Sequence, residues 1–219
     1  AVTAAAAVSA SPGAPAAVEP ASPSAPSAPA PVLVLFGLPG AGKTHCGALA
    51  GRELGCAFHD GDSWLPDDLR ASLARGEGFT DEQRQRFAEE VGRRIAEASA
   101  AEAAERGVNA RPLVVSQAMF KRRFRDIVRS AHPRVHFVWV RDDGEARLER
   151  LRAGGNLVDT ELGKRMALDF EPPDPTAEPD IPAIDNPAGT TDEDLLRQLA
   201  TILERVRESD AIRGSPGAA

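Results

Sequence analysis

The sequence predicts an α/β fold in which a parallel five-stranded sheet is flanked by helices. Two observations lead to this prediction. Short apolar runs of strand length alternate with helical patterns about five times along the chain, which is the order of a doubly wound parallel sheet. The first run, Val32 to Phe36, is apolar at every position, as expected of a strand that is buried on both faces.

The predicted strands can be placed by their apolar runs. They lie at Val32 to Phe36, Cys56 to His59, Leu113 to Val115, Val135 to Val140 and Ala183 to Ile184. Between the first two, Lys43 to Leu54 has a helical pattern, and Gly55 is suited to end that helix. Parallel strands joined by helices bring their carboxyl ends to one edge of the sheet, where ligands bind in open α/β folds.

Helices fill the remaining intervals. They are predicted over Leu65 to Leu73, after Thr80, after Lys121, over Glu145 to Arg152 and after Thr191. Thr80 with Gln83 forms a capping box, and Phe87, Val91 and Ile95 then recur on one face. Residues 159–170 follow a glycine pair and are expected to form a mobile lid, and several prolines within 172–182 predict a loop after it.

The ends of the chain differ from this pattern. Residues 1–31 consist of Ala, Pro, Ser, Gly, Val and Thr with Glu19 as the one charge, so we expect a disordered leader. A processed transit remnant and a passive linker both remain open, and with them the plastid stroma and the cytoplasm as locations. We predict one domain over 32–208 and a flexible tail over 209–219.

The amino-acid composition limits the classes of molecule that the chain is expected to bind. The 219 residues are 42% hydrophobic and 27% charged, as in soluble globular proteins. No apolar run approaches the roughly 20 residues of a membrane-spanning helix. The net charge of -7 argues against a general nucleic-acid surface, and Cys46 and Cys56 alone do not make a disulfide framework. We therefore expect a small-molecule substrate, with no nucleic acid or membrane partner.

A phosphate-binding motif follows the first predicted strand. The segment Gly37-Leu38-Pro39-Gly40-Ala41-Gly42-Lys43-Thr44 has the P-loop pattern, whose glycines let backbone N–H groups converge on phosphate oxygens. Lys43 is expected to reach the β- and γ-phosphates of ATP, and the Thr44 hydroxyl to bind Mg²⁺. The predicted nucleotide-binding residues are Gly37, Gly40, Ala41, Gly42, Lys43, Thr44 and His45. His45 taken alone is more typical of an ordinary helix residue.

Two aspartates end the second predicted strand. Asp60 and Asp62 are separated by Gly61, so both can face a cleft at the strand end. One of them would hold Mg²⁺ and the other would accept the proton of an attacking hydroxyl. After the third strand, Lys121 and Arg125 belong to a basic cluster that is expected to contact an anionic substrate. A solvated basic face explains that cluster equally well.

Several segments resemble gluconate kinase. They are Phe58 to Asp62, Gly76 to Arg84, Phe124 to Arg129, Glu149 to Leu151 and Phe170 to Pro173. The resemblance implies a P-loop kinase of the nucleoside-monophosphate-kinase type, in which ATP phosphorylates a hydroxyl of a sugar acid. It further implies that Lys43, Asp62 and Arg84 are catalytic and that Asp62 and Arg84 face the substrate. The similar Asp-x-Asp pair of shikimate kinases assigns Asp60 to Mg²⁺ and Asp62 to the base.

The chain also departs from that family. Leu65, Leu69 and Ser72 stand where gluconate kinases have histidine, asparagine and lysine, and Gly154 to Leu157 replaces an arginine-rich lid. Adenylylsulfate kinase is a second resemblance, through Asp60 to Asp62 and Gly78 to Arg84. A third reading is a nucleotide-binding subunit whose kinase activity has decayed. A homodimer and membership of a larger complex both stay open.

Overall fold

The computed structural model describes residues 30–154 and 157–213. The predicted leader, except for its last two residues, and the end of the predicted tail at 214–219 lie outside the described residues. The strands are β1 Val32–Phe36, β2 Ala57–Asp60, β3 Leu113–Ser116, β4 Val135–Arg141 and β5 Ala183–Asp185. The helices are α1 Lys43–Glu53, α2 Asp67–Ala74, α3 Asp81–Arg106, α4 Arg122–Ala131, α5 Glu145–Arg152, α6 Thr160–Leu168 and α7 Asp192–Arg213, with 3₁₀ turns at Gly61–Trp64 and Gly107–Asn109.

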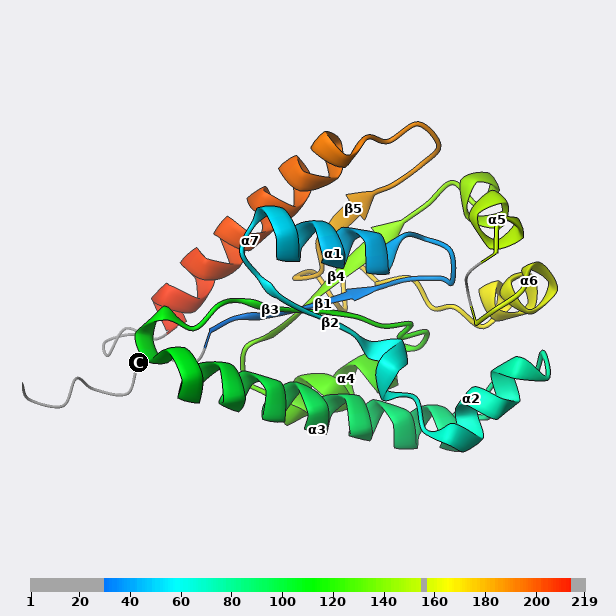
Figure 1. Cartoon of the computed structure of the whole chain (residues 1–219), viewed down its shortest axis with the longest axis horizontal. Helices are drawn as coiled ribbons and strands as arrows, with labels where there is room; N and C mark the ends of the chain where they lie inside the picture. The colour runs from blue at the N-terminus through cyan, green and yellow to red at the C-terminus, as the bar shows by residue number, and fades with distance from the viewer. Residues whose placement is uncertain (1–29, 155–156, 214–219) are drawn as a thin grey trace, which may run out of the picture.

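The predicted parallel sheet is confirmed. Its five strands lie in the order β2-β3-β1-β4-β5, and every neighbouring pair is parallel. β1 occupies the centre, which explains why all its side chains are apolar and buried. In Figure 1, α1 and α7 cover one face of the sheet, while α3 and α4 cover the other.

Each face of the sheet has its own apolar core. Val32, Val34 and Phe36 of β1 point toward the face covered by α3 and α4. Leu33 and Leu35 point toward α1 and α7. Successive side chains of a strand point to opposite faces, so the continuous apolar run of β1 fills both cores. The sheet is thereby fixed between two helical layers, and its carboxyl edge is held in place for the site.

A capping box and a proline set the first residues of two helices. Thr80 Oγ1 accepts from Gln83 N at 3.2 Å, and the Gln83 side chain accepts from Thr80 N at 2.8 Å, so the predicted capping box begins α3. The predicted helix at Leu65 starts two residues later because the residue before Pro66 is restricted to extended conformations.

The last helix corrects one predicted boundary. α7 continues to Arg213, past the predicted domain end at 208. Its last turns are held because the Asp210 carboxylate accepts from Arg134 Nε at 2.7 Å and lies 3.1 Å from His136 Nε2. Within the described part of the chain, no helix has both the length and the apolar character needed to cross a membrane.

Candidate active site

The loop between β1 and α1 has the backbone of a phosphate cradle. Gly40 and Gly42 have φ angles of 81° and 99°, a left-handed conformation that favours glycine. A Cβ atom at Gly42 would lie 2.3 Å from Asn186 Nδ2, and one at Gly40 would lie 2.8 Å from the Arg147 carbonyl oxygen. The loop then opens α1, whose positive dipole end favours anions. Glycine is thus required where the motif places it.

Lys43 lies over this loop. Its Nζ donates to the Leu38 carbonyl oxygen at 2.8 Å. Burial lowers the pKa of Lys43, while the nearby carboxylates of Asp62, Asp60 and Asp142 act in the opposite direction. The ammonium group is therefore placed between the loop and the acidic residues that end β2.

The Asp60 carboxylate accepts hydrogen bonds from both the P-loop and β3. Its Oδ1 accepts from Asp62 N and from Ser116 Oγ, both at 3.1 Å, and its Oδ2 accepts from Thr44 Oγ1 at 3.4 Å. Magnesium prefers oxygen ligands and usually takes few from the protein, with water and phosphate completing the shell. No cluster of three His, Cys, Asp or Glu side chains suited to a metal occurs among the described residues. The donor set at Thr44 and Asp60 therefore fits Mg²⁺ shared with a nucleotide better than a closed metal site.

Asp62 lies in the 3₁₀ turn that follows β2. It is an exposed residue and lines the pocket at the carboxyl edge of the sheet. Desolvation raises the pKa of Asp62, the Lys43 charge lowers it, and the Asp60 charge raises it further, with a net upward shift. A carboxylate whose pKa is raised toward neutral pH is a better proton acceptor than an ordinary one.

A single pocket of about 550 Å³ brings the two halves of the predicted site together. Among the predicted site residues, its lining includes Gly40, Gly42, Lys43, Thr44, His45, Asp60, Asp62 and Arg84. Gly37 and Ala41 belong to the loop but do not line the pocket, and Ala41 is fully buried. His45 lies at the surface, and its Nε2 is 2.7 Å from Asp192 Oδ1 at the start of α7.

Arg84 is the predicted cation on the far side of this pocket. It extends from the first turns of α3, and its guanidinium lies over the Phe120 ring, 5.5 Å from the centroid. Its Nη2 donates to Asp169 Oδ2 at 3.0 Å, and its Nη1 lies 3.5 Å from Asp81 Oδ1. Arg84 therefore links α3 to the residue that follows α6.

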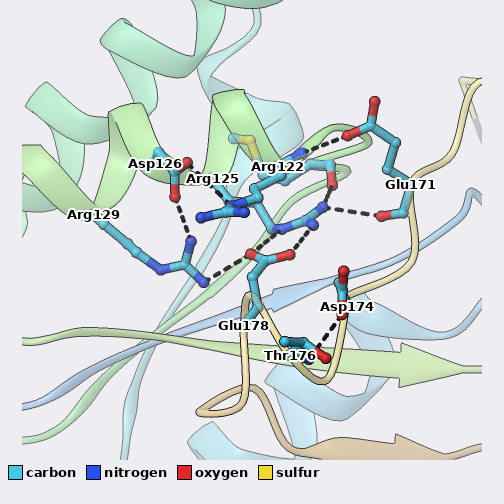
Figure 2. A network of polar contacts seen from close by, with 9 residues as sticks. Arg122, Arg125, Asp126, Arg129, Glu171, Asp174, Thr176 and Glu178 are labelled. Atoms are coloured by element: carbon cyan, nitrogen blue, oxygen red, sulfur yellow. Dashed lines mark hydrogen bonds and ion pairs between the residues drawn. The ribbon is translucent and has the colours of Figure 1, made fainter.

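The structure corrects the prediction that Arg125 contacts the substrate. Arg125 is fully buried, and its Nε donates to Glu178 Oε1 at 2.9 Å. Its Nη1 donates to the carbonyl oxygens of Met119 and Glu171 at 3.3 and 3.2 Å. Figure 2 shows Glu178 held between Arg125 and Arg129. This guanidinium fixes a loop to α4 and does not reach the pocket.

Lys121 is corrected in the same way. Its Nζ donates to both carboxylate oxygens of Asp81, at 3.1 and 3.2 Å. It lines a separate hollow of about 420 Å³, together with Asp81, Arg122, Arg123, Asp126 and Glu171. The roles of Lys121 and Arg125 could not be resolved from sequence because their partners Asp81 and Glu178 are distant along the chain.

Other pocket residues were missed by the sequence reasoning. Arg150 of α5 donates to the Gly40 carbonyl oxygen at 3.4 Å and to the Asn186 carbonyl oxygen at 3.1 Å. Asn186 Nδ2 in turn donates to the Ala41 carbonyl oxygen at 2.8 Å. Ser116 and Gln117 could have been found, since they directly follow a predicted strand at the ligand-binding edge. For Arg70 the sequence shows only a charged residue on a predicted helix, which does not indicate a place in the pocket.

Comparisons with known proteins agree with this architecture. No family model matches the chain. The thermosensitive gluconokinase of Escherichia coli is 31% identical over 153 residues, which cover 69% of this chain and 77% of that protein. The crystal structure of a gluconokinase from Sinorhizobium meliloti is 25% identical with a TM-score of 0.66, covering 85% of this chain and 98% of the other.

A second solved structure supports the fold alone. A sugar kinase from a Janibacter species is 22% identical with a TM-score of 0.67, covering 80% of this chain and 95% of the other. The thermosensitive gluconokinase of Escherichia coli indicates more than the fold, because it is 31% identical and this chain covers 77% of its length. The chain therefore belongs to the gluconokinase family of small-molecule kinases.

Proposed function

We propose that this kinase transfers the γ-phosphoryl group of ATP, with Mg²⁺, to a hydroxyl group of a sugar acid, with gluconate as the first candidate. The observation that supports the proposal most strongly is the placement of Asp62. This carboxylate shares one pocket with the P-loop, and its charge acts to raise the pKa of Lys43 against the effect of burial. The pocket thus offers a phosphate cradle and a proton acceptor on adjoining walls.

The residues divide between the two substrates. On the nucleotide side, the backbone of 37–44 and the Lys43 ammonium would hold the phosphates, and Thr44 with Asp60 would hold Mg²⁺. When bound, MgATP would supply the phosphoryl group and neutralise part of its charge. On the acceptor side, Asp62 would take the proton from the attacking hydroxyl oxygen. Arg84 faces the same space from α3.

An ADP-release assay tests this function. The purified chain is incubated with ATP and Mg²⁺, and ADP is measured with gluconate, other sugar acids, shikimate or adenylylsulfate as the acceptor. We expect gluconate or another sugar acid to stimulate ADP release, and we expect removal of Mg²⁺ to abolish the stimulation. Stimulation by shikimate or adenylylsulfate alone would instead assign the chain to one of those two acceptor classes. If no acceptor stimulates ADP release, the proposed function is wrong.

One observation supports a second candidate function. Part of the acceptor side is apolar, because Leu65 and Leu73 line the pocket and Leu69 is fully buried. A nucleotide-binding subunit without kinase activity would tolerate such a wall. Tight ATP binding without acceptor-stimulated ADP release, together with a protein that purifies alongside the chain, would favour this alternative.

A further inference from the structure

Arg70 is a pocket cation that lies near the Asp62 carboxylate, and its charge acts to lower the pKa of that group. It extends from α2, and its Nη2 donates to the Asp62 carbonyl oxygen at 3.1 Å. Across the described ranges 30–154 and 157–213, its guanidinium takes part in no ion pair. Arg84, by contrast, is already paired with Asp81 and Asp169. Arg70 therefore retains donor capacity for an anionic ligand beside Asp62.

Arg70 is also the polar group that α2 contributes to the pocket. Within residues 65–74, the pocket is lined by Leu65, Arg70 and Leu73. Ser72 is turned away, because its hydroxyl donates to Glu77 Oε2 at 3.2 Å. A charged or hydroxyl-rich ligand next to this helix would consequently have to be recognised through Arg70.

Gln117 supplies an unused donor on the neighbouring wall. It follows β3 and is 3% exposed, and its Oε1 accepts from Ala118 N at 2.6 Å. Its Nε2 is buried and has no hydrogen-bond partner in the part of the chain that the structure describes. Buried amide groups are rarely left unpaired, since an unmade hydrogen bond costs free energy. The side chain lines the same pocket as Arg70.

The two donors flank the turn that carries the proposed base. A Cβ atom on Gly61 would lie 2.8 Å from Gln117 Nε2, so the amide is packed against the middle of Asp60-Gly61-Asp62. Arg70 contacts the end of the same segment through the Asp62 carbonyl oxygen. A ligand that bridges both donors would lie beside the Asp62 carboxylate.

Building on the proposed kinase function, we propose that Arg70 and Gln117 recognise the acceptor in this chain. Arg70 binds the carboxylate of a hydroxy acid, and Gln117 Nε2 donates a hydrogen bond to one of its hydroxyl oxygens. A second hydroxyl is thereby brought to Asp62.

Substitutions at both positions test this assignment. KM and kcat are measured for gluconate and for glucitol, the neutral polyol with the same carbon chain, at saturating ATP. Loss of a charge-assisted contact in Arg70→Gln is expected to raise KM for gluconate by about tenfold to a hundredfold. The KM for ATP should stay within about twofold of wild type, KM should rise more for gluconate than for glucitol, and Arg70→Lys should recover part of the loss.

Gln117→Leu is expected to raise KM for both acceptors, because both carry hydroxyl groups. Arg75→Gln is the matched control, since Arg75 is an exposed arginine beside α2 that pairs with Glu77 and does not line the pocket. It should leave every constant unchanged. An effect of Arg70 transmitted only through the Asp62 backbone would lower kcat for both acceptors and leave KM for gluconate unchanged, which would overturn the proposal. So would a loss of acid preference in Arg84→Gln but not in Arg70→Gln.

A binding measurement separates this proposal from the proposed function. Trp64 lies in the 3₁₀ turn with Asp62, so its fluorescence is suited to report acceptor binding without turnover. If the wild type releases no ADP, the proposed function fails, but gluconate should still change the fluorescence of the wild type, and Arg70→Gln should need a gluconate concentration about tenfold to a hundredfold higher. Gluconate binding of equal affinity in both proteins, or none in the wild type, would overturn the recognition pair.

Discussion

Replacing Arg125 with methionine should remove a large part of the stability of this fold. The Arg125 side chain is 0% exposed and that of Glu178 is 2% exposed, so the pair is fully withdrawn from water. Figure 2 shows that it ties α4 to the loop after α6. Methionine fills much of the same space but provides no charge, and the Glu178 carboxylate would remain buried with a weaker set of donors.

The size of the stability loss depends on the Glu178 carboxylate, which stays buried in the variant. Breaking a buried ion pair by removing one partner typically costs about 3–5 kcal/mol, because an uncompensated charge stays buried. Arg129 Nη2 still donates to Glu178 Oε1 at 3.0 Å in the variant, which favours the lower end of that range. We therefore expect a loss of about 3 kcal/mol. For a domain of this size that corresponds to a fall in Tm of about 6–12 °C.

Urea unfolding measures this loss as a shift of the midpoint at constant slope. Arg122→Met is the control on the same helix, because Arg122 makes an exposed ion pair with Asp126 and should contribute about 1 kcal/mol or less. The double variant Arg125→Met with Glu178→Leu removes both charges and should recover most of the stability. A loss below about 1 kcal/mol in Arg125→Met, or no recovery in the double variant, would refute the reasoning.

Four further predictions concern individual groups. Lys43→Ala should abolish acceptor-stimulated ADP release while the urea midpoint stays close to wild type, and appreciable turnover would remove Lys43 from catalysis. Asp62→Asn should lower kcat by about 10²–10⁴ with ATP affinity retained, as measured by nucleotide titration; an unchanged kcat would show that Asp62 is not the base. The pKa of Asp62 is raised from 3.8, so kcat/KM should fall with decreasing pH at values above 3.8, and an acid limb at or below it would contradict the assignment. Burial raises the pKa of Cys46 to about 11, so this thiol should resist iodoacetamide in the native protein at pH 8 and react after denaturation.

The fold was readable from sequence because its signals are local. The apolar run of β1, the glycines of the P-loop and the capping box at Thr80 each depend on residues within one short segment. The order of strands and helices then leaves a doubly wound sheet as the natural arrangement. Asp60 and Asp62 could be placed at the carboxyl edge for the same reason, since they directly follow a strand.

The rest of the site depends on contacts between distant segments. Arg125 and Glu178 are 53 residues apart, and nothing near either residue indicates that they form a buried pair. Lys121 is likewise occupied by Asp81, 40 residues away. The sequence alone therefore does not show whether a basic residue after a strand binds a ligand or forms an ion pair within the protein. Gln117 could be placed at the edge, but its unpaired amide becomes apparent only when the turn at Gly61 packs against it.

The nucleotide half and the acceptor half of the pocket differ in which residues can be substituted without loss of the fold. The nucleotide half is built from backbone, and its glycines are fixed by close contacts with Asn186 and Arg147. The acceptor half is built from side chains on α2, α3 and the end of β3, whereas the strands pair through their backbone groups. Substitution there can exchange one set of acceptor contacts for another while the phosphate cradle stays intact. This separation explains how apolar residues on α2 can coexist with a complete P-loop.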